Sequence, residues 1–170
     1  MSVPRFTDQF AELFRAHHPQ LLRVLVRLSG EPELAADVIQ EAFVSLHRRG
    51  SMPETPEAWL VTVALNRLRN ERAKSGRHAR KLGVIAGAFP SPSTPTLSEV
   101  AEARSARHEV RAALETLDER ERQLLVLRSE GYSYRDIAAA LSLNEASVGT
   151  LLARARRAFL AAYGESDASR

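Results

Sequence analysis

Apolar residues recur roughly every three to four positions along most of the chain, a spacing typical of amphipathic helices. A proline-rich stretch divides them into two groups. Aromatic residues make up only 6% of the sequence, so Leu, Val and Ala must supply most of any core, which suits helices better than a β-sandwich. Pro19 should break or kink the first helix. The periodicity predicts helices over the following ranges: about 10–28, 33–49, 56–79, 99–116 and 119–130, and two more within 134–153.

Residues 82–98 interrupt the helical pattern. They read LGVIAGAFPSPSTPTLS, with three prolines and no charged residue. Because proline removes a backbone donor and disfavours helix in the residue before it, this stretch should be an irregular linker. Its apolar residues, among them Phe89, leave open whether part of it packs on another element. The sequence therefore predicts an all-α protein of two small helical domains, residues 1–81 and 99–170, joined by a flexible linker.

The clearest local motif is the segment 134–153, which fits a helix-turn-helix. Its apolar residues stand where two helices would pin each other, with the small Ala138 at the crossing and Ser142 at the tight turn. Ser133 and Asn144 are suited to cap the two helices. Any pair of short amphipathic helices could share the spacing, but here a small residue and two caps coincide with it. In such a motif the second helix enters the major groove of DNA.

Candidate DNA contacts follow from this motif and from the placement of charge. Polar residues near the start of the second helix, and arginines after it, would contact bases and phosphates: Asn144, Ser147, Thr150, Arg154 and Arg157. Between Arg67 and Lys81 stand seven basic residues and one acid, Glu71. This run indicates a phosphate-binding helix, with a solvated helix face as the alternative. The chain up to Lys81 carries 13 basic and 9 acidic residues, whereas the part from Glu99 onward carries 11 and 12. The positive charge is therefore concentrated in the first domain.

Several classes of function are disfavoured by what the sequence lacks. It has no cysteine, hence neither a disulfide nor a thiolate metal site. Its five histidines lack metal-ligand spacing and no glycine-rich phosphate loop is present, so we expect no enzyme activity, cofactor or metal. No apolar run approaches the roughly 20 residues that span a membrane, and MSVPRFTDQF lacks the apolar core of a secretory signal. We expect a soluble, cytoplasmic protein without membrane insertion.

Segments of both groups, taken in order, resemble the extracytoplasmic-function (ECF) sigma factors of bacterial RNA polymerase. The resemblance covers nearly the whole chain. For the second region of the family it rests on residues 37–43 (DVIQEAF), 58–60 (AWL) and 63–66 (VALN). For the fourth region it rests on residues 133–134 and 137–138 and on the run LLARARRAF.

The resemblance implies a function and its partners. The helix carrying Asp37, Gln40 and Glu41 would dock on the largest subunit of core RNA polymerase, and the loop 50–55 would hold a base flipped from the promoter's upstream-ten element. The helix-turn-helix would read the thirty-five element, with the linker threading the polymerase between the two sites. An anti-sigma factor is the expected inhibitor. The third helix would line the promoter DNA with these residues: Asn66, Arg69, Arg72, Lys74 and Arg77.

Two interpretations and one rival function stay open. Family members usually carry a basic residue where this chain has Gly149, and often another in place of Leu152, so we expect weaker contact with the thirty-five element. Trp59 is either a core residue or a base-stacking aromatic, and its place on an apolar stripe favours the core. The rival is a stand-alone helix-turn-helix regulator, which the acidic residues of 37–41 argue against.

Overall fold

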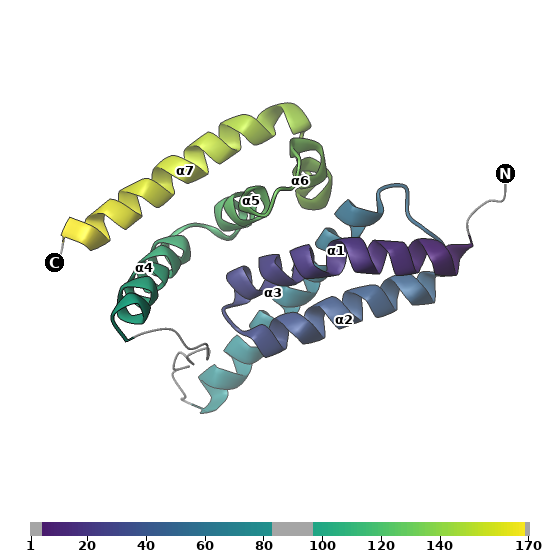
Figure 1. Ribbon diagram of the computed structural model, residues 1–170, viewed down its shortest axis with the longest axis horizontal. Coiled ribbons are helices and arrows are strands. Elements are labelled where there is room, and N and C mark those ends of the chain that lie inside the picture. The colour runs from purple at the N-terminus through teal and green to yellow at the C-terminus, as the bar shows by residue number, and fades with distance from the viewer. Residues whose placement is uncertain (1–4, 83–96, 169–170) are drawn as a thin grey trace.

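The computed structural model describes residues 5–82 and 97–168, with side chains described within 5–75 and 106–164. In these ranges the protein contains helices and no strand, which confirms the predicted all-α class (Figure 1). None of these helices is both long and apolar enough to cross a membrane. Most of the predicted linker, Phe89 included, lies outside the described residues. The helices are α1 (Phe6–Ser29), α2 (Pro32–Arg49), α3 (Pro56–Leu82), α4 (Leu97–Thr116), α5 (Glu119–Ser129), α6 (Tyr134–Leu141) and α7 (Glu145–Ala168).

Helices α1, α2 and α3 form the first group. α1 and α2 lie side by side and antiparallel because only a tight turn joins them (Figure 1). Gly30 ends α1 in the left-handed conformation, with φ of 74°. The three helices bury their apolar faces against one another, at roughly 1.5–3 kcal/mol for each large aliphatic side chain. The largest buried side chains of this group are Leu21, Val24, Leu25, Ile39, Leu46, Leu60 and Val61.

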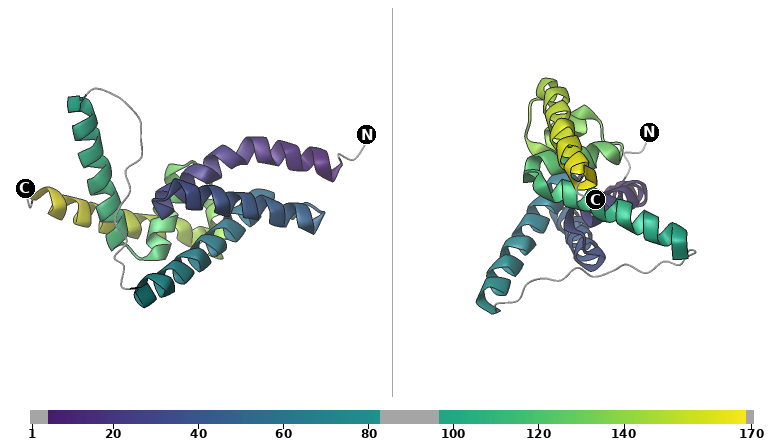
Figure 2. Two further views of the ribbon diagram at one scale, coloured as in Figure 1. Left: turned by 90° about the horizontal axis from the view of Figure 1, so that it is seen from below. Right: turned by 90° about the vertical axis from the view of Figure 1, so that its left-hand side faces the viewer.

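Pro19 does not interrupt α1. The helix runs unbroken from Phe6 to Ser29, and its ribbon bends along its length (Figure 2). Of the two outcomes expected from the sequence, a break is wrong and a bend is observed. Proline lacks the N–H that would bond to the carbonyl of Arg15, so the helix loses one bond there while its buried face holds both parts together.

Helices α4 to α7 form the second group and contain the helix-turn-helix, α6 and α7. The predicted caps are confirmed. Ser133 Oγ accepts from the Asp136 backbone N–H at 3.1 Å, and the Asp136 carboxylate accepts from the Ser133 N–H at 3.2 Å, which forms a capping box. Ser142 adopts the left-handed conformation at the turn, with φ of 54°. Asn144 Oδ1 accepts from the Ala146 N–H at 3.0 Å at the start of α7.

The two groups pack on each other rather than standing apart. α1 contacts α5, and α3 contacts α6. Buried side chains from both groups belong to one continuous hydrophobic cluster, which includes Leu25 and Leu60 from the first and Ile137 and Val148 from the second. The predicted domain boundaries at residues 81 and 99 stay a prediction.

Candidate nucleic-acid interface

The middle of α3 presents the first candidate DNA contacts. Asn66 and Arg69 are exposed and lie one turn apart, and Arg69 Nη2 donates to Asn66 Oδ1 at 2.9 Å. This bond holds the guanidinium near the amide and leaves the other N–H groups of Arg69 free to donate. A pre-positioned Arg of this kind suits a phosphate oxygen, which it can bind through two donors.

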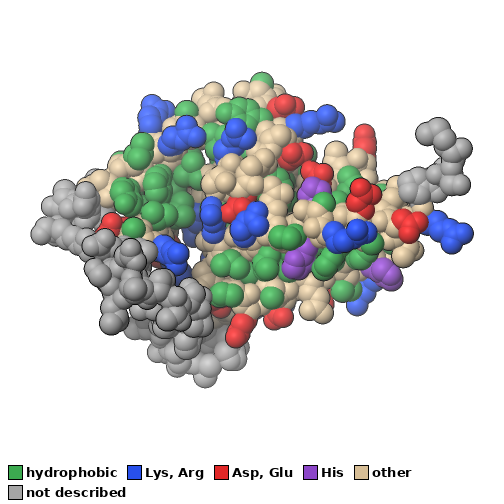
Figure 3. Space-filling view, in the orientation of Figure 1, with side chains coloured by type: hydrophobic (Ala, Val, Ile, Leu, Met, Phe, Trp, Pro, Cys, Tyr) green, Lys and Arg blue, Asp and Glu red, His purple; other side chains and the backbone are tan. Residues whose placement is uncertain are grey.

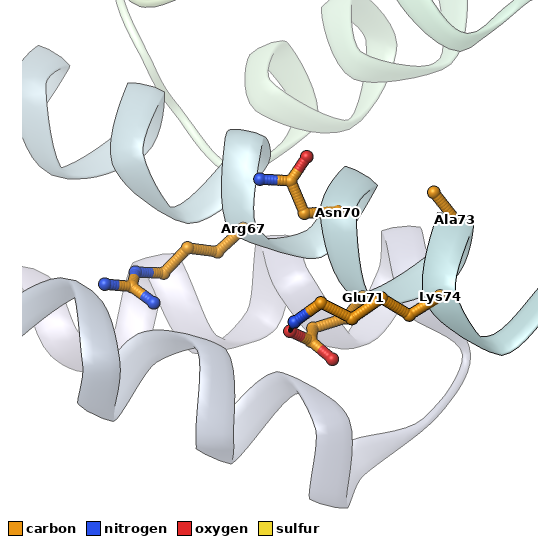
Figure 4. A pocket seen from close by; sticks show the side chains of 5 residues that line it. All are labelled: Arg67, Asn70, Glu71, Ala73 and Lys74. Atoms are coloured by element: carbon orange, nitrogen blue, oxygen red, sulfur yellow. Dashed lines mark hydrogen bonds and ion pairs between the residues drawn. The ribbon is translucent and has the colours of Figure 1, made fainter.

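A shallow pocket lies next to these residues on α3. Figure 4 shows Glu71 and Lys74 together on one side of the helix, while Asn70 points the other way. Lys74 Nζ lies 2.7 Å from Glu71 Oε1 in an exposed ion pair. Since exposed pairs of this kind contribute only about 0–1 kcal/mol, Lys74 can exchange Glu71 for a phosphate at little cost.

Arg67 turns from α3 toward α2. Its Nη2 donates to Ser45 Oγ at 2.9 Å, and its Nη1 lies 3.4 Å from Glu41 Oε2. Ser45 Oγ in turn donates to the Glu41 carbonyl at 2.8 Å. Arg67 therefore links the basic helix to one of the predicted polymerase-binding residues.

Arg72 is exposed, as the predicted outward stripe requires, but its guanidinium is bonded within the protein. Its Nη2 donates to the Leu28 carbonyl, near the end of α1. Partial burial of the guanidinium, and next the positive charge of Arg122, lower the pKa of Arg72 below its usual value. A phosphate contact by Arg72 would require this bond to open, and its DNA-binding role stays a prediction. The side chain of Arg77 lies outside the described residues.

The predicted polymerase-binding residues share an exposed face of α2. Asp37, Gln40 and Glu41 are all exposed, whereas their neighbours Val38 and Ile39 are buried in the core. Asp37 and Glu41 are one turn apart on that face, as the spacing predicts. Of the three, only Glu41 has a side-chain partner in the described part of the chain, Arg67. The face presents acid to a partner without any rearrangement of the helix.

The start of α7 carries the predicted base-reading residues. Asn144, Ser147 and Thr150 are all exposed. Asn144 uses its amide oxygen as the cap, so its amide N–H groups remain available as donors. These short polar side chains suit contacts to base edges at the N-terminal end of a recognition helix.

Farther along α7, Arg154 and Arg157 differ in their surroundings. Arg154 Nε lies 3.0 Å from Glu121 Oε1, and its Nη2 lies 3.9 Å from Asp118 Oδ2, both from the region where α5 begins. Arg157 is exposed with no partner among the described residues. Arg154 thus joins α7 to α5 and must share its guanidinium if it also contacts a phosphate.

The expectation based on Gly149 and Leu152 needs correction. Leu152 is only 3% exposed, and an added Cβ at Gly149 would lie 3.4 Å from the Tyr134 ring. Leu152 therefore points into the protein, where a basic side chain would not reach DNA, whereas Gly149 is partly exposed and the expectation for it stays a prediction. What remains of the argument is that residues 144–153 hold no Lys or Arg.

The loop after α2 and the tryptophan behind it are anchored to the core. Met52, in the loop 50–55 expected to hold a flipped base, packs against the hydrophobic cluster. Trp59 also packs on that cluster, which confirms the core interpretation. The backbone N–H of Trp59 donates to the Thr55 carbonyl at 3.0 Å, so the loop enters α3 through a regular first turn.

Sequence reasoning missed a polar contact between the two groups of helices. Gln20, Arg23 and Arg27 of α1 all reach Glu130, just after α5. Figure 3 shows basic side chains flanking an acidic one in the middle of this face. The only local signal was the pair of arginines one turn apart, and nothing near them in the sequence identifies a partner more than 100 residues away.

Comparison with known families accounts for this arrangement of sites. The Sigma-70 region 2 family matches residues 13–78, and the Sigma-70 region 4 family matches residues 107–159. The first match contains the acidic face of α2 and most of the basic helix α3. The second contains α5, α6 and the first part of α7, with the exposed residues of the helix-turn-helix.

Curated relatives agree with the family match. The ECF sigma factor SigJ of Mycobacterium tuberculosis is 31% identical over 87% of this chain, which spans about half (49%) of SigJ. The sigma factor CarQ of Myxococcus xanthus is 31% identical over 89% of this chain and 86% of its own length. The ECF sigma factor SigM of M. tuberculosis is 32% identical over 86% and 73%, respectively.

Two solved structures, one of them a sigma factor, share the fold. RpoE from Bartonella quintana, solved in complex with the anti-sigma factor NepR, covers 91% of this chain and 96% of its own, with a TM-score of 0.65 and 21% identity. CnrH, solved in complex with the cytosolic domain of CnrY, covers 89% and 85%, with a TM-score of 0.63 and 25% identity. By family matches, relatives and fold, the chain belongs to the extracytoplasmic-function sigma factors of RNA polymerase.

Proposed function

We propose that the protein binds core RNA polymerase in the cytoplasm and directs transcription initiation at promoters that it reads with both groups of helices. The observation that carries the proposal is one chain with an exposed acidic face on α2, a basic α3 and a capped helix-turn-helix, in the order of two sigma regions. On this proposal the protein has no catalytic role and needs no cofactor. Membership in this family does not favour a stand-alone regulator.

The division of labour between the helices follows from charge and exposure. Residues 1–81 would dock on polymerase and hold the upstream-ten element, and residues 99–170 would read the thirty-five element. The exposed Asn66 and Arg69 support the first assignment, and the exposed start of α7 supports the second. Because residues 144–153 carry no cation, most of the attraction to phosphate would come from α3.

Run-off transcription tests the proposal directly. Purified core polymerase is mixed with the protein and fragmented genomic DNA, and the 5′ ends of the transcripts are mapped. We expect starts that appear only when the protein is present and that share two sequence elements upstream. Core polymerase that gives the same transcripts with and without the protein would refute the proposal.

The docking face is tested by charge reversal. Asp37→Arg places a cation in the acidic face of α2, and we expect it to abolish co-purification with core polymerase, because like charges at an interface cost several kcal/mol. Glu12→Arg is the matched control, since Glu12 is an exposed acid on α1 away from that face. Equal retention of both variants by polymerase would contradict the docking role.

The basic helix is tested through salt dependence. In the assembled polymerase complex, Arg69→Ala should weaken promoter binding and reduce the slope of log affinity against log salt by about one, the signature of one lost phosphate contact. Arg15→Ala, which removes an exposed arginine from α1, should leave the slope unchanged. Identical slopes for the two variants would remove Arg69 from the interface.

Regulation by an anti-sigma factor is part of the proposal. It is supported by the structural neighbour RpoE, which was solved with an anti-sigma factor bound. Affinity purification of the protein from cells of its source, followed by addition of any co-purified protein to the run-off assay, should yield an inhibitor. If none of the co-purified proteins reduces transcription, that result would argue against regulation by an anti-sigma factor but not against the rest of the proposal.

A further inference from the structure

Glu130 is a buried carboxylate at the junction of the two groups of helices. It follows the last residue of α5, and its side chain is only 5% exposed. Oε2 accepts from Arg23 Nε at 2.8 Å, and Oε1 lies 3.1 Å from Arg27 Nη1. A buried carboxylate is tolerated only when it is paired in this way, because removal from water costs several kcal/mol. The position of Glu130 therefore depends on α1.

The backbone around Glu130 is held by the same helix. Gln20 Nε2 donates to the Glu130 carbonyl at 2.7 Å, and Arg27 Nη1 also donates to Ser129 Oγ at 3.0 Å. Gln20, Arg23 and Arg27 lie at successive turns of α1, so one stripe of a single helix supplies all of these contacts between the groups. We call these three residues and Glu130 the clasp.

Two further contacts join the groups away from the clasp. Thr62 Oγ1 of α3 lies 3.1 Å from the Ala140 carbonyl of α6, as well as 2.8 Å from the Ala58 carbonyl in its own helix. On the other side, the Arg111 guanidinium of α4 lies against Gly30 in the turn between α1 and α2. In the described part of the chain, these polar contacts therefore join the groups at separate places, in addition to the shared apolar cluster, and among them the clasp buries a carboxylate.

We propose that the closed arrangement is an autoinhibited resting state and that the clasp is its latch. This inference rests on the proposed function, in which polymerase lies between the two promoter elements and the two groups must part to reach them. While the clasp is closed, the start of α7 stays fixed against α3 through α6. Binding to polymerase and promoter must therefore supply the free energy that opens the clasp.

The chemistry of the clasp suits a latch that opens as a unit. If the groups separate, Glu130 and both arginines regain water together, so no charge is left buried and unpaired. If only one partner is removed while the groups stay closed, Glu130 remains buried without its full complement. Substitution of Glu130 by glutamine removes the charge that both arginines bind, and it should shift the closing equilibrium toward the open form about 10- to 100-fold, the usual effect of losing a charged hydrogen bond.

The distance between the groups in the isolated full chain is the direct test. The chain has no cysteine, so Ala16→Cys in α1 and Ala161→Cys in α7, both exposed, accept spin labels at two known positions. Double electron–electron resonance on this labelled chain should give one narrow distribution that agrees with the closed structure. With Glu130→Gln added, the distribution should become longer and broader. A labelled chain that is already broad, or one that Glu130→Gln leaves narrow, overturns the proposal.

Glu121→Gln is the matched control. Glu121 is also on α5, is 15% exposed in its side chain and pairs with an arginine at 3.0 Å, but that arginine, Arg154, belongs to the same group. We expect its narrow distribution to persist, and broadening equal to that of Glu130→Gln would count against the clasp. If circular dichroism shows that Glu130→Gln loses helix, the double variant Arg23→Gln/Arg27→Gln replaces it, since both side chains are more than half exposed.

The regulatory consequence has its own readout. In run-off transcription, Glu130→Gln should reach half-maximal output at about one tenth of the protein concentration that the unsubstituted chain needs, because the competent state is more populated. Broad distances with unchanged half-saturation would show that the latch exists but does not inhibit, which overturns autoinhibition. If no variant supports transcription, the proposed function fails, whereas the distance measurement still decides whether the clasp holds the groups together.

Discussion

Two glycines with nearly identical backbones allow the closed arrangement to be tested without touching the clasp. Gly30 ends α1 with φ and ψ of 74° and 5°, and Gly50 ends α2 with 71° and 5°. Substitution of either by alanine places a Cβ in the left-handed region, at a cost of about 1–2 kcal/mol in the free energy of unfolding. The local backbone penalty should therefore be the same at both positions.

The surroundings of the two glycines differ. An added Cβ at Gly50 meets nothing within 4 Å, whereas one at Gly30 would overlap the Arg111 guanidinium and lie 2.8 Å from its Nη1. Arg111 is 47% exposed in its side chain and pairs with Glu115, so it can move aside, and the loss is that of a surface contact, up to about 1 kcal/mol. Gly30→Ala should therefore cost up to about 1 kcal/mol more than Gly50→Ala.

Urea unfolding followed by circular dichroism measures both costs, and a double-mutant cycle isolates the contact. In a protein that already carries Arg111→Ala, the added Cβ no longer overlaps a guanidinium. The further loss in the free energy of unfolding caused by Gly30→Ala should then equal the loss caused by Gly50→Ala in the unsubstituted protein. Equal costs for the two single glycine variants, with no coupling to Arg111, would mean that α4 does not lie against the α1–α2 turn in solution. The closed arrangement would then be refuted independently of Glu130.

Three other predictions concern the helix-turn-helix and its surroundings. Ser133→Ala removes half of the capping box and should cost about 1 kcal/mol in urea unfolding. Leu152→Ala should lower the free energy of unfolding by about 2–5 kcal/mol, because Leu152 is buried. Thr150→Ala, at an exposed position, should leave that free energy unchanged but weaken promoter binding. The reverse pattern would mean that the other face of α7 points into the protein. Burial, and next the charge of Glu57, raise the pKa of Tyr132 above its usual 10.0, so the fold favours the neutral phenol and stability should fall as the pH rises above about 10. In Tyr132→Phe the urea midpoint should lose this decline, and an unchanged decline would assign it to other groups.

Features set by neighbouring residues were predictable from the sequence. The caps at Ser133 and Asn144, the left-handed turn at Ser142 and the end of α1 at Gly30 each depend on backbone chemistry within a few positions. The exposed and buried faces of α2 also followed from spacing, since a helix places residues three and four apart on one side. Pro19 shows the limit of such reasoning, because packing of the whole helix outweighed a local preference for breaking it.

Features set by distant residues were not predictable. Arg154 and Arg72 are exposed, as expected from their places off the apolar faces, but their partners could not be predicted, since the acids of α5 hold one and the carbonyl of Leu28 holds the other. Leu152 was assigned to the DNA-facing side by resemblance to the family, yet the structure buries it. The turn between α6 and α7 sets the rotation of α7, and a rotation by one residue moves a position by about 100°. Such errors concern direction rather than the presence of the helix.

The clasp also separates how strongly the two groups associate from how they are oriented. Most of the attraction between them comes from apolar side chains that join one cluster, and such attraction is not directional. A buried Arg–carboxylate set adds little stability relative to apolar residues of the same size, because the desolvation of its charges offsets their attraction. Breaking the set by removing one partner is costly, and so is any orientation that leaves Glu130 unpaired. The apolar contacts therefore favour closure in general, and Glu130 selects one closed geometry. An interface of this kind can be both well defined and easy to open, which is what a sigma factor needs if its two promoter-reading elements are to be released together when polymerase binds.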